Sequence, residues 1–360
     1  MTKHPELKRR VRDRMAKTGE SYTAARAHVV AEQPPAAAAT LHLTNGDATV
    51  PGILATGLAE TVVPWRDVLH EGPVPDVPDD ELRRIRSRFL AGEHASDIGT
   101  AKELEQRDRT LAAHRAGAYV LWFEADLYDQ LQVAQILATL LALEVSAERV
   151  TLICIGEHVG SAHFGGLGEL SAEQLARLPE TAATVLTPAA LEHGARAWAA
   201  LRAPDPAGLR AIAATPSAEL RFLAEAFDRL GREYPSTRDG LSLTERRILA
   251  AVAEGAPDAG TAFVRATARE ARPFLGDTWC FDRMTRLATG QEPLLAAEPA
   301  APVTRRTRLT LTAAGRRVLE GRADHVALNG VDRWIGGVHL RGRTVPWRWD
   351  DGTEAVVAAG

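Results

Sequence analysis

The sequence has little cysteine and no long apolar segment. Its 360 residues include two cysteines, Cys154 and Cys280, and no Cys-x-x-Cys pair, which argues against a disulfide framework or a zinc site. No apolar run reaches the ~18 residues that a helix needs to cross a bilayer. The N-terminal MTKHPELKRR is not followed by the apolar region of a secretory signal. We therefore expect a cytoplasmic protein with no membrane partner.

The signatures of several common activities are absent as well. The chain has neither the GxGxxG fingerprint of dinucleotide-binding domains nor the GK[ST] of a phosphate loop. It also lacks a GxSxG elbow, so a serine hydrolase has little support. A net charge of −4 excludes a polycation that coats nucleic acid over its whole surface. No motif identifies a reaction, and the cofactor, any metal and the oligomeric state are left unassigned.

The length of the chain is sufficient for two or three domains. Residues 1–40 form a basic N-terminal tail with a Pro/Ala linker, and residues 41–170 are predicted to form an α/β domain. Residues 171–239 have the periodicity of a helical connector, and residues 240–360 form a C-terminal module. The tail is either a solvated appendage or an arm that contacts phosphates or a partner.

Apolar runs alternate with helical patterns through residues 41–170. Runs at 41–44, 60–65, 118–124 and 150–156 predict strands, and the segments between them predict helices. The last two runs are apolar throughout, which is typical of strands buried on both faces. Strands that alternate with helices indicate a Rossmann-like α/β domain with a mainly parallel sheet.

The C-terminal module has three predicted helices followed by a strand. Ser242 or Thr244 caps the first helix, Thr278–Thr289 is the third, and the strand falls within 305–312. This order is typical of a winged helix, an α+β fold. The terminal segment is predicted to form a β-hairpin with Asn329-Gly330 as its turn.

Several ordered motifs resemble an uncharacterised bacterial family, domain of unknown function 1835. The strongest are HLTNGD and WRDVLHEGP in the first half of the chain, and LNGVDRWIGGVHL and WRWD in the second. The resemblance runs from about Leu41 to about Asp350. It implies the order of the domains and no activity.

Polar residues follow the predicted strands at their carboxyl ends. Ligands of open α/β sheets bind beyond these ends, and adjacent parallel strands bring them together. We therefore expect one site there. Its ligand-contacting residues are expected to be Asn45, Gly46, Asp47, Trp65, Asp126, Arg84 and Arg88, with Asp67 and His70 as the catalytic residues. The two arginines share one helix face and either clamp an anion or lie in solvent.

The segment WRDVLHEGP is unusually rich in chemically useful residues. Asp67 could orient the His70 imidazole for general-base catalysis. The two side chains could equally be metal ligands. The structural alternative is a rigid loop in which Asp67 caps a turn and Trp65 fills the core.

The other strand ends also allow two interpretations. Gly46 ahead of a helix could let the backbone approach a phosphate, although Asp47 would repel that charge. Alternatively, Asn45 and Gly46 form a turn and Asp47 caps the helix. Asp126 suits the N-cap of the next helix. The glycine-rich segment 163–168 indicates either close backbone approach or a tight turn.

Arginines in the C-terminal module could contact DNA. Residues 241–350 hold 17 Arg and no Lys against 12 Asp and Glu, so this region is net basic by five. Arg283 and Arg286 lie on the third helix, and Arg305 and Arg306 on the expected wing. Against this, the third helix is apolar for a recognition helix, and many winged helices contact proteins instead.

Three functions fit these observations. The first is a domain that binds a small anionic ligand or nucleotide, coupled to a winged-helix module with a regulatory or nucleic-acid role. The second is an enzyme that uses Asp67 and His70. The third is a protein-interaction adaptor with no chemistry.

Overall fold

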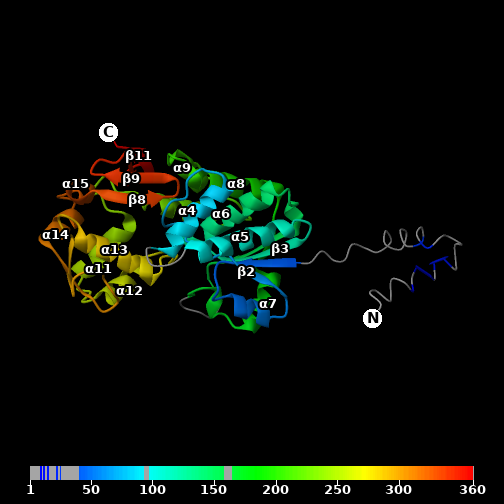
Figure 1. The fold of residues 1–360 in the computed structure, drawn as a ribbon. Helices are drawn as coiled ribbons and strands as arrows, with labels where there is room; N and C mark the ends of the chain where they lie inside the picture. Colours follow the sequence, from blue (N-terminus) through cyan, green and yellow to red (C-terminus); the bar gives the residue numbers. More distant parts are fainter. Residues whose placement is uncertain are drawn as a thin grey trace.

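A computed structural model describes residues 40–92, 97–157 and 164–359 (Figure 1). Before residue 40 it describes seven isolated positions: Arg9, Val11, Arg12, Arg14, Met15, Tyr22 and Ala25. The predicted basic tail therefore lies almost wholly outside the described residues, as does the start of the glycine-rich segment at 163.

A five-stranded sheet forms the centre of the N-terminal half. Its strands, in the spatial order β2-β1-β3-β4-β5, are Val62–Pro64, Thr40–Thr44, Ala118–Glu124, Val150–Ile155 and Ala183–Val185. The first four in this order are parallel, and β5 pairs antiparallel with β4. The predicted mainly parallel α/β sheet is confirmed, and its last strand lies beyond the expected boundary at residue 170.

Helices cover both faces of this sheet. Successive side chains of a strand point to opposite faces, and in this sheet both sets include apolar side chains that need cover. Tyr119, Leu121 and Phe123 of β3 join one apolar core, whereas Trp122 joins the other. The first face is covered by α6 (Leu127–Ala142), on which α8 (Pro188–Arg202) packs. The helices α3 (Val50–Ala55) and α7 (Ala172–Thr181) cover the second face (Figure 1).

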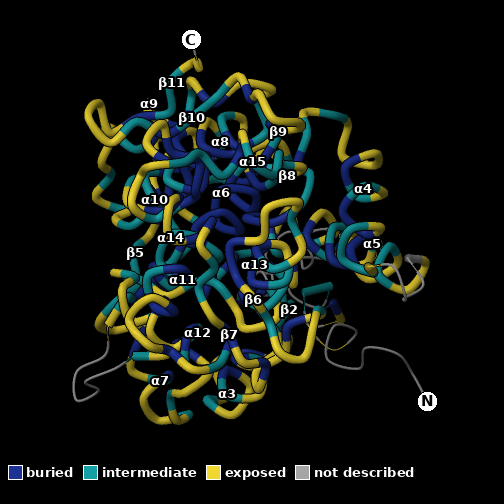
Figure 2. The backbone as a smooth tube through the Cα atoms, turned by 90° about the vertical axis from the view of Figure 1, so that its left-hand side faces the viewer, coloured by how far each residue is buried: buried dark blue, intermediate teal, exposed yellow. Residues whose placement is uncertain are grey.

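Four further helices complete the N-terminal half. They are α4 (Asp79–Ala91), α5 (Asp97–Ala113), α9 (Ala207–Ala213) and α10 (Leu223–Gly231). The pair α4 and α5 packs together, and α10 packs on α9 and α6. The tube in Figure 2 shows continuous burial along α6, the helix that lies beneath these neighbours.

Residues 241–319 form a C-terminal module with an apolar core of its own. Its elements are α11 (Leu243–Ala253), α12 (Ala259–Thr267), α13 (Asp277–Thr289), β6 (Leu295–Glu298), β7 (Arg308–Leu311) and α14 (Ala313–Leu319). Ser242 caps α11 in a capping box with Glu245, so the first of the two expected caps is correct. The expected third helix is present as α13, and β6 pairs antiparallel with β7.

The last forty residues do not extend the C-terminal module. They form α15 (His325–Asn329) and two hairpins, β8–β9 (Val331–Ile335, Val338–Gly342) and β10–β11 (Trp347–Asp350, Ala355–Ala358). Most of their buried apolar residues join the core of the N-terminal half, whereas Leu328 of α15 packs against the core of the module. The predicted hairpin exists, but its turn is Gly336-Gly337, because Asn329-Gly330 ends α15 instead.

No helix in the described part of the chain is both long enough and apolar enough to span a membrane.

Candidate functional site

The carboxyl ends of β1 and β3 meet at the point where the strand order changes direction. The Asn45 amide nitrogen donates to both carboxylate oxygens of Asp129, at 2.9 and 3.2 Å, and to Glu124 at 3.4 Å. The Glu124 backbone nitrogen also donates to Asp129. Such a switch point is where open α/β sheets form their ligand crevice. The structure thus brings Asn45 to the end of the neighbouring strand.

A third carboxylate stands beside these two, at the start of α6. Asp126 caps the helix by accepting a hydrogen bond from the Asp129 backbone nitrogen at 3.0 Å, as predicted. Burial, with the nearby charge of Glu124, raises the pKa of Asp126 to about 7. Burial also raises the pKa of Glu124, and it raises the pKa of Asp129 well above its usual range. Asp126 therefore titrates near neutral pH, and Glu124 and Asp129 keep their protons to a higher pH than exposed carboxyl groups do.

The glycine-rich segment closes over this cluster. The Leu167 backbone nitrogen donates to Glu124 at 2.7 Å, and the Gly165 nitrogen donates to Glu169 at 3.1 Å. Gly166 has φ +129°, and a side-chain carbon there would lie 2.8 Å from the Glu124 carboxylate. The backbone does approach closely, as one of the two interpretations predicted. The amides of Gly165 and Leu167 are occupied by carboxylates of this chain.

A cleft of about 470 Å³ opens beside these carboxylates. Its sheet side includes Glu124, Asp126 and Glu157, and the loop that follows α12 contributes Arg272 and Pro273. Arg272 reaches across to the Gly156 carbonyl at 3.4 Å. The cleft therefore has one wall from the N-terminal half and another from the C-terminal module, and its sheet side is acidic.

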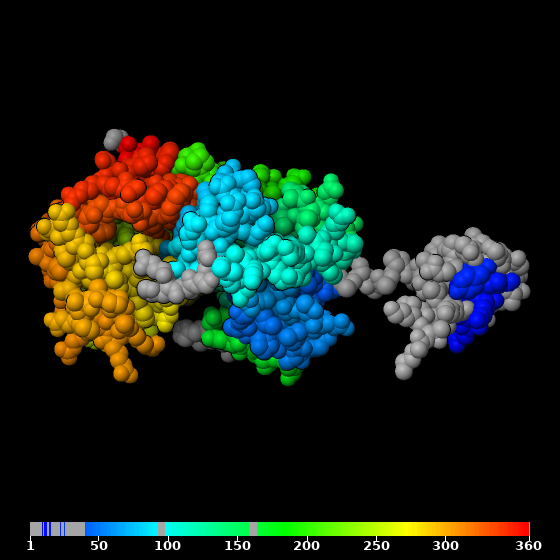
Figure 3. Space-filling view, in the orientation of Figure 1, coloured from blue at the N-terminus to red at the C-terminus, as the bar shows by residue number. Residues whose placement is uncertain are grey.

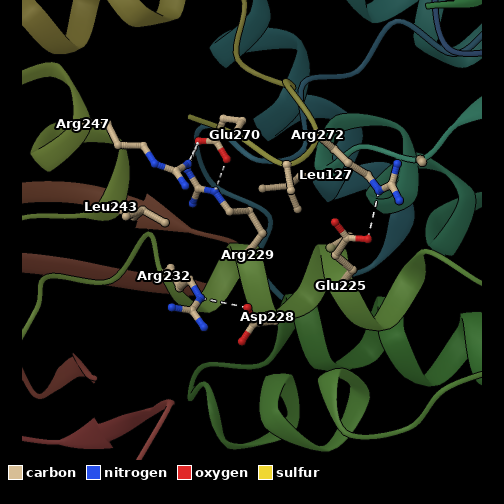
Figure 4. A pocket seen from close by; sticks show the side chains of 12 residues that line it. Leu127, Glu225, Asp228, Arg229, Arg232, Leu243, Arg247, Glu270 and Arg272 are labelled. Atoms are coloured by element: carbon tan, nitrogen blue, oxygen red, sulfur yellow. Dashed lines mark hydrogen bonds and ion pairs between the residues drawn. The ribbon is translucent and has the colours of Figure 1, made fainter. Parts of the chain in front are cut away.

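A smaller pocket of about 210 Å³ adjoins the cleft and shares Arg272 with it (Figure 4). Each of its arginines faces a carboxylate. The pairs are Arg229–Glu270 at 2.7 Å, Arg232–Asp228 at 2.8 Å and Arg272–Glu225 at 2.9 Å, with Arg247 also bonded to Glu270. Each arginine of this pocket thus has a carboxylate partner, whereas no arginine of the described residues forms an ion pair with Glu124 or Asp126.

Within the described ranges, no group of three or more His, Cys, Asp or Glu side chains has the arrangement of a metal site.

Asp67 and His70 do not form the expected pair. Asp67 is 1% exposed and accepts two hydrogen bonds from Arg86, at 2.7 and 3.0 Å. Arg86 also donates to backbone carbonyls of the 68–73 segment, so it holds this loop in place. The structural alternative is the correct one for Trp65, which is buried and donates to Gln135 at 2.7 Å. Neither Trp65 nor Asp67 lines the cleft.

His70 is buried at the boundary between the two halves. Its ring meets Tyr128 and Phe274 edge-on, at centroid distances of 5.8 and 5.1 Å. Neither ring nitrogen has a hydrogen-bond partner in the described structure. Burial lowers the pKa of His70 to about 4, so the imidazole is neutral at pH 7.

The remaining predicted ligand residues lie apart from the cleft. Asp47 is exposed and pairs with Arg66, and it does not cap α3, whose N-cap is Thr49. An added side-chain carbon at Gly46 would meet no atom of the described structure within 4 Å, so the approach of a ligand to this glycine stays a prediction.

The predicted arginine clamp is not assembled either. Arg84 is exposed and pairs with Asp80 at 3.0 Å, and Arg88 is exposed on the same helix. The arginine of this helix that binds a carboxylate in the interior is Arg86, on the buried face.

Of the four arginines predicted to contact DNA, Arg283 is used inside the molecule. It is 5% exposed and forms a buried ion pair with Glu71, so its guanidinium does not face solvent. Arg286 is exposed and pairs with Asp282 at 2.8 Å. Arg305 and Arg306 are exposed. The prediction for Arg283 is therefore corrected, and the other three remain predictions.

Four residues that organise this region were not among the predicted site residues. Glu124 and Asp129 flank Asp126 at the end of β3, and their position beyond a buried strand was the available signal. Arg86 follows Leu82 by four residues on the buried face of α4, a spacing visible in the sequence. Arg272 comes from a distant part of the chain, and no local pattern connects it with the sheet.

No protein-family model matches the chain, and no curated protein is similar to it. The resemblance to domain of unknown function 1835 therefore stays a prediction.

Proposed function

We propose that the chain binds a small molecule in the cleft between the sheet and the C-terminal module. The observation that carries this proposal is the double wall, with Glu124 and Asp126 on one side and Arg272 on the other. Clefts at the carboxyl edge of an α/β sheet are where such folds bind ligands. A ligand held there contacts both halves and stabilises their closed arrangement.

The chemistry of the sheet side favours a ligand with a protonated amine or a similar hydrogen-bond donor. Glu124 and Asp126 present carboxyl oxygens, and the amides of Gly165 and Leu167 are already bonded to carboxylates. A phosphate on that side would meet these carboxyl groups in place of a positive charge. The proposal therefore replaces the expected anionic ligand or nucleotide with an amine-bearing molecule.

We infer that residues 241–319 are a winged helix whose partner is the N-terminal half of the same chain. Three helices and an antiparallel strand pair support this assignment, as does a β-bridge between Asp258 and Arg308. The yellow surface of the C-terminal module borders the light-blue surface of the N-terminal half (Figure 3). Trp279 of α13 stacks on Phe89 of α4 with ring centroids 5.3 Å apart. Because this helix packs inside the molecule, it is better placed to respond to ligand binding than to contact DNA bases.

A second candidate is acid–base catalysis in the same cleft. The observation that favours it is Asp126, because a carboxyl group with a pKa of about 7 can both accept and donate a proton at neutral pH. In that case Asp126→Asn would abolish turnover of an amine substrate and leave most of its binding.

A thermal-shift screen of amines, carboxylates and phosphates at equal ionic strength tests the proposed function. We expect amines to raise the melting temperature of the wild-type protein and to lose this effect in Asp126→Asn. Asparagine is also a good N-cap, so this substitution removes charge and keeps the helix start. Asp258→Asn is the matched control, since Asp258 caps α12 outside the cleft. Equal stabilisation by phosphate, or an unchanged response in Asp126→Asn, would contradict the proposal.

A further inference from the structure

His70 lies directly behind the two walls of the cleft. One of its ring contacts, Tyr128, is two residues beyond Asp126, and the other, Phe274, follows Pro273. Both imidazole nitrogens are buried without a hydrogen-bond partner in the described structure. Leaving a buried polar group unsatisfied costs about 1–3 kcal/mol, so an apolar side chain would be the more stable choice for a passive spacer.

Charged groups approach His70 from each part of the chain that packs around it. Glu71 lies beside it in the same loop, Arg283 comes from α13, Glu233 follows α10, and Arg333 comes from β8. Arg283 pairs with Glu71, and Arg333 pairs with Glu233 at 2.6 Å. Neither aromatic neighbour is hydrogen-bonded to the imidazole, and the Tyr128 hydroxyl donates to the Asn45 carbonyl at 3.3 Å. Because the acids and arginines balance one another, burial decides the charge state of His70.

The boundary that His70 occupies contains several ion pairs. The N-terminal half and the C-terminal module have separate apolar cores. Phe274 of the module packs against the core of the N-terminal half, beside His70. Other contacts across the boundary include the ion pairs Arg229–Glu270 and Arg272–Glu225 and the stack of Trp279 on Phe89. An interface of this kind can separate without exposing a large apolar surface.

We propose that His70 is a proton-sensitive latch: the neutral imidazole allows Phe274 to close the boundary, and protonation releases the C-terminal module. Release would move Arg272 and Pro273 away from the sheet, and so open the cleft. The latch requires no ligand, whereas its control of ligand access rests on the proposed function.

The direction of the pH effect follows from the two states of His70. In the closed state its pKa is about 4, and in water it is 6.5. Closure is therefore fully stable above pH 6.5 and weakens as the pH falls towards 4. For these values the opening equilibrium increases about 30-fold between pH 8 and pH 5.

Other groups at the boundary either titrate outside the pH range of about 4 to 6.5 or change the stability of closure in the opposite direction. Burial acts to raise the pKa values of Glu71 and Glu233, but neighbouring guanidinium groups outweigh it and lower both values. These are Arg283 and Arg333 for Glu71, and Arg333 and Arg229 for Glu233, so protonation of the two acids weakens closure only at still lower pH. Asp126, with a pKa of about 7, favours its buried state as the pH falls. The contribution of His70 is therefore the difference between wild type and a variant that lacks the imidazole.

Hydrogen exchange of the full chain without ligand measures this difference. Exchange rates of peptides spanning 66–74 and 269–276 are divided by their intrinsic rates at pH 8 and pH 5. We expect wild type to lose about 30-fold more protection than His70→Phe or His70→Gln. His193→Gln is the control, because His193 is also buried but lies on α8, away from this boundary.

Two results would overturn the latch. One is equal loss of protection in wild type and in both His70 variants. The other is retention of protection at pH 5 in wild type. Either result leaves the amine screen unaffected, so failure of the latch and failure of the proposed function are distinguishable.

Discussion

At the scale of single residues, the buried charged groups are of two kinds. Some are paired with each other and hold the fold together, and others have no partner of opposite charge and are available to a ligand. Arg86 and Asp67 satisfy each other and fix the loop after β2. Glu124 and Asp129 at the end of β3 form no ion pair with an arginine of the described residues, and burial together with neighbouring carboxylates raises their pKa values. An uncompensated buried carboxylate costs stability, and such residues are typical of functional sites.

Two arginines of α4 provide a direct test of the first assignment. We expect Arg86→Met to lower the free energy of unfolding by about 3–5 kcal/mol, because it leaves Asp67 buried without a partner. Arg84→Met removes an exposed pair four residues apart and should cost less than about 0.5 kcal/mol. Urea denaturation measures both, and similar costs would show that the buried pair does not hold the loop.

Asp126 should produce a stability change that depends on pH. Its raised pKa means that the folded protein binds this proton more tightly than the unfolded chain does. The resulting stabilisation is complete below about pH 3.8 and is lost as the pH rises through 7. Asp126→Asn should therefore gain more stability relative to wild type at pH 8 than at pH 5. Asp258→Asn should show no such increase, because the pKa of Asp258 is lowered.

At the scale of secondary-structure elements, the site depends on how the glycine-rich segment meets β3. The short helix Leu167–Glu169 begins where Gly166 turns its backbone towards Glu124. The backbone angles of Gly166, φ 129° and ψ 170°, are ones that other residues essentially do not adopt. This glycine therefore allows the segment to cover the carboxylates.

Substitution of this glycine should disturb the cover and leave the sheet intact. We expect Gly166→Ala to cost about 1–3 kcal/mol, from backbone strain and from the contact with Glu124. Gly46→Ala, at the end of β1, has open space around the added carbon and should change stability by less than about 0.5 kcal/mol. Thermal unfolding compares the two, and equal effects would contradict the proposed cover.

The elements that sequence patterns predicted well are those with strong local periodicity. Both faces of β3 are apolar, and the helix after it has a cap at Asp126, so both were predictable. β5 has three residues, and its place in the sheet depends on pairing with β4. No local sequence pattern predicts this pairing. Asn329-Gly330 has the composition of a hairpin turn, but in the structure Gly330 is the C-cap of α15.

At the scale of the whole molecule, the cleft exists because distant segments meet. The α/β half and three of the C-terminal helices were predicted separately, and no sequence pattern indicated that α13 lies against the loop after β2. Ion pairs such as Arg283–Glu71 join residues more than two hundred positions apart. For the same reason Asp67 and His70 were expected to pair, although their real partners are on α4 and in the C-terminal module.

Native mass spectrometry of the protein purified from cells under mild conditions tests the central claim most directly. The account predicts a small molecule bound to the wild type that carries a protonated nitrogen once it is released and identified. The molecule should be absent from Asp126→Asn and present in Asp258→Asn. A bound species that persists in Asp126→Asn, or bare polypeptide mass in all three proteins even with millimolar amines added, would contradict the account.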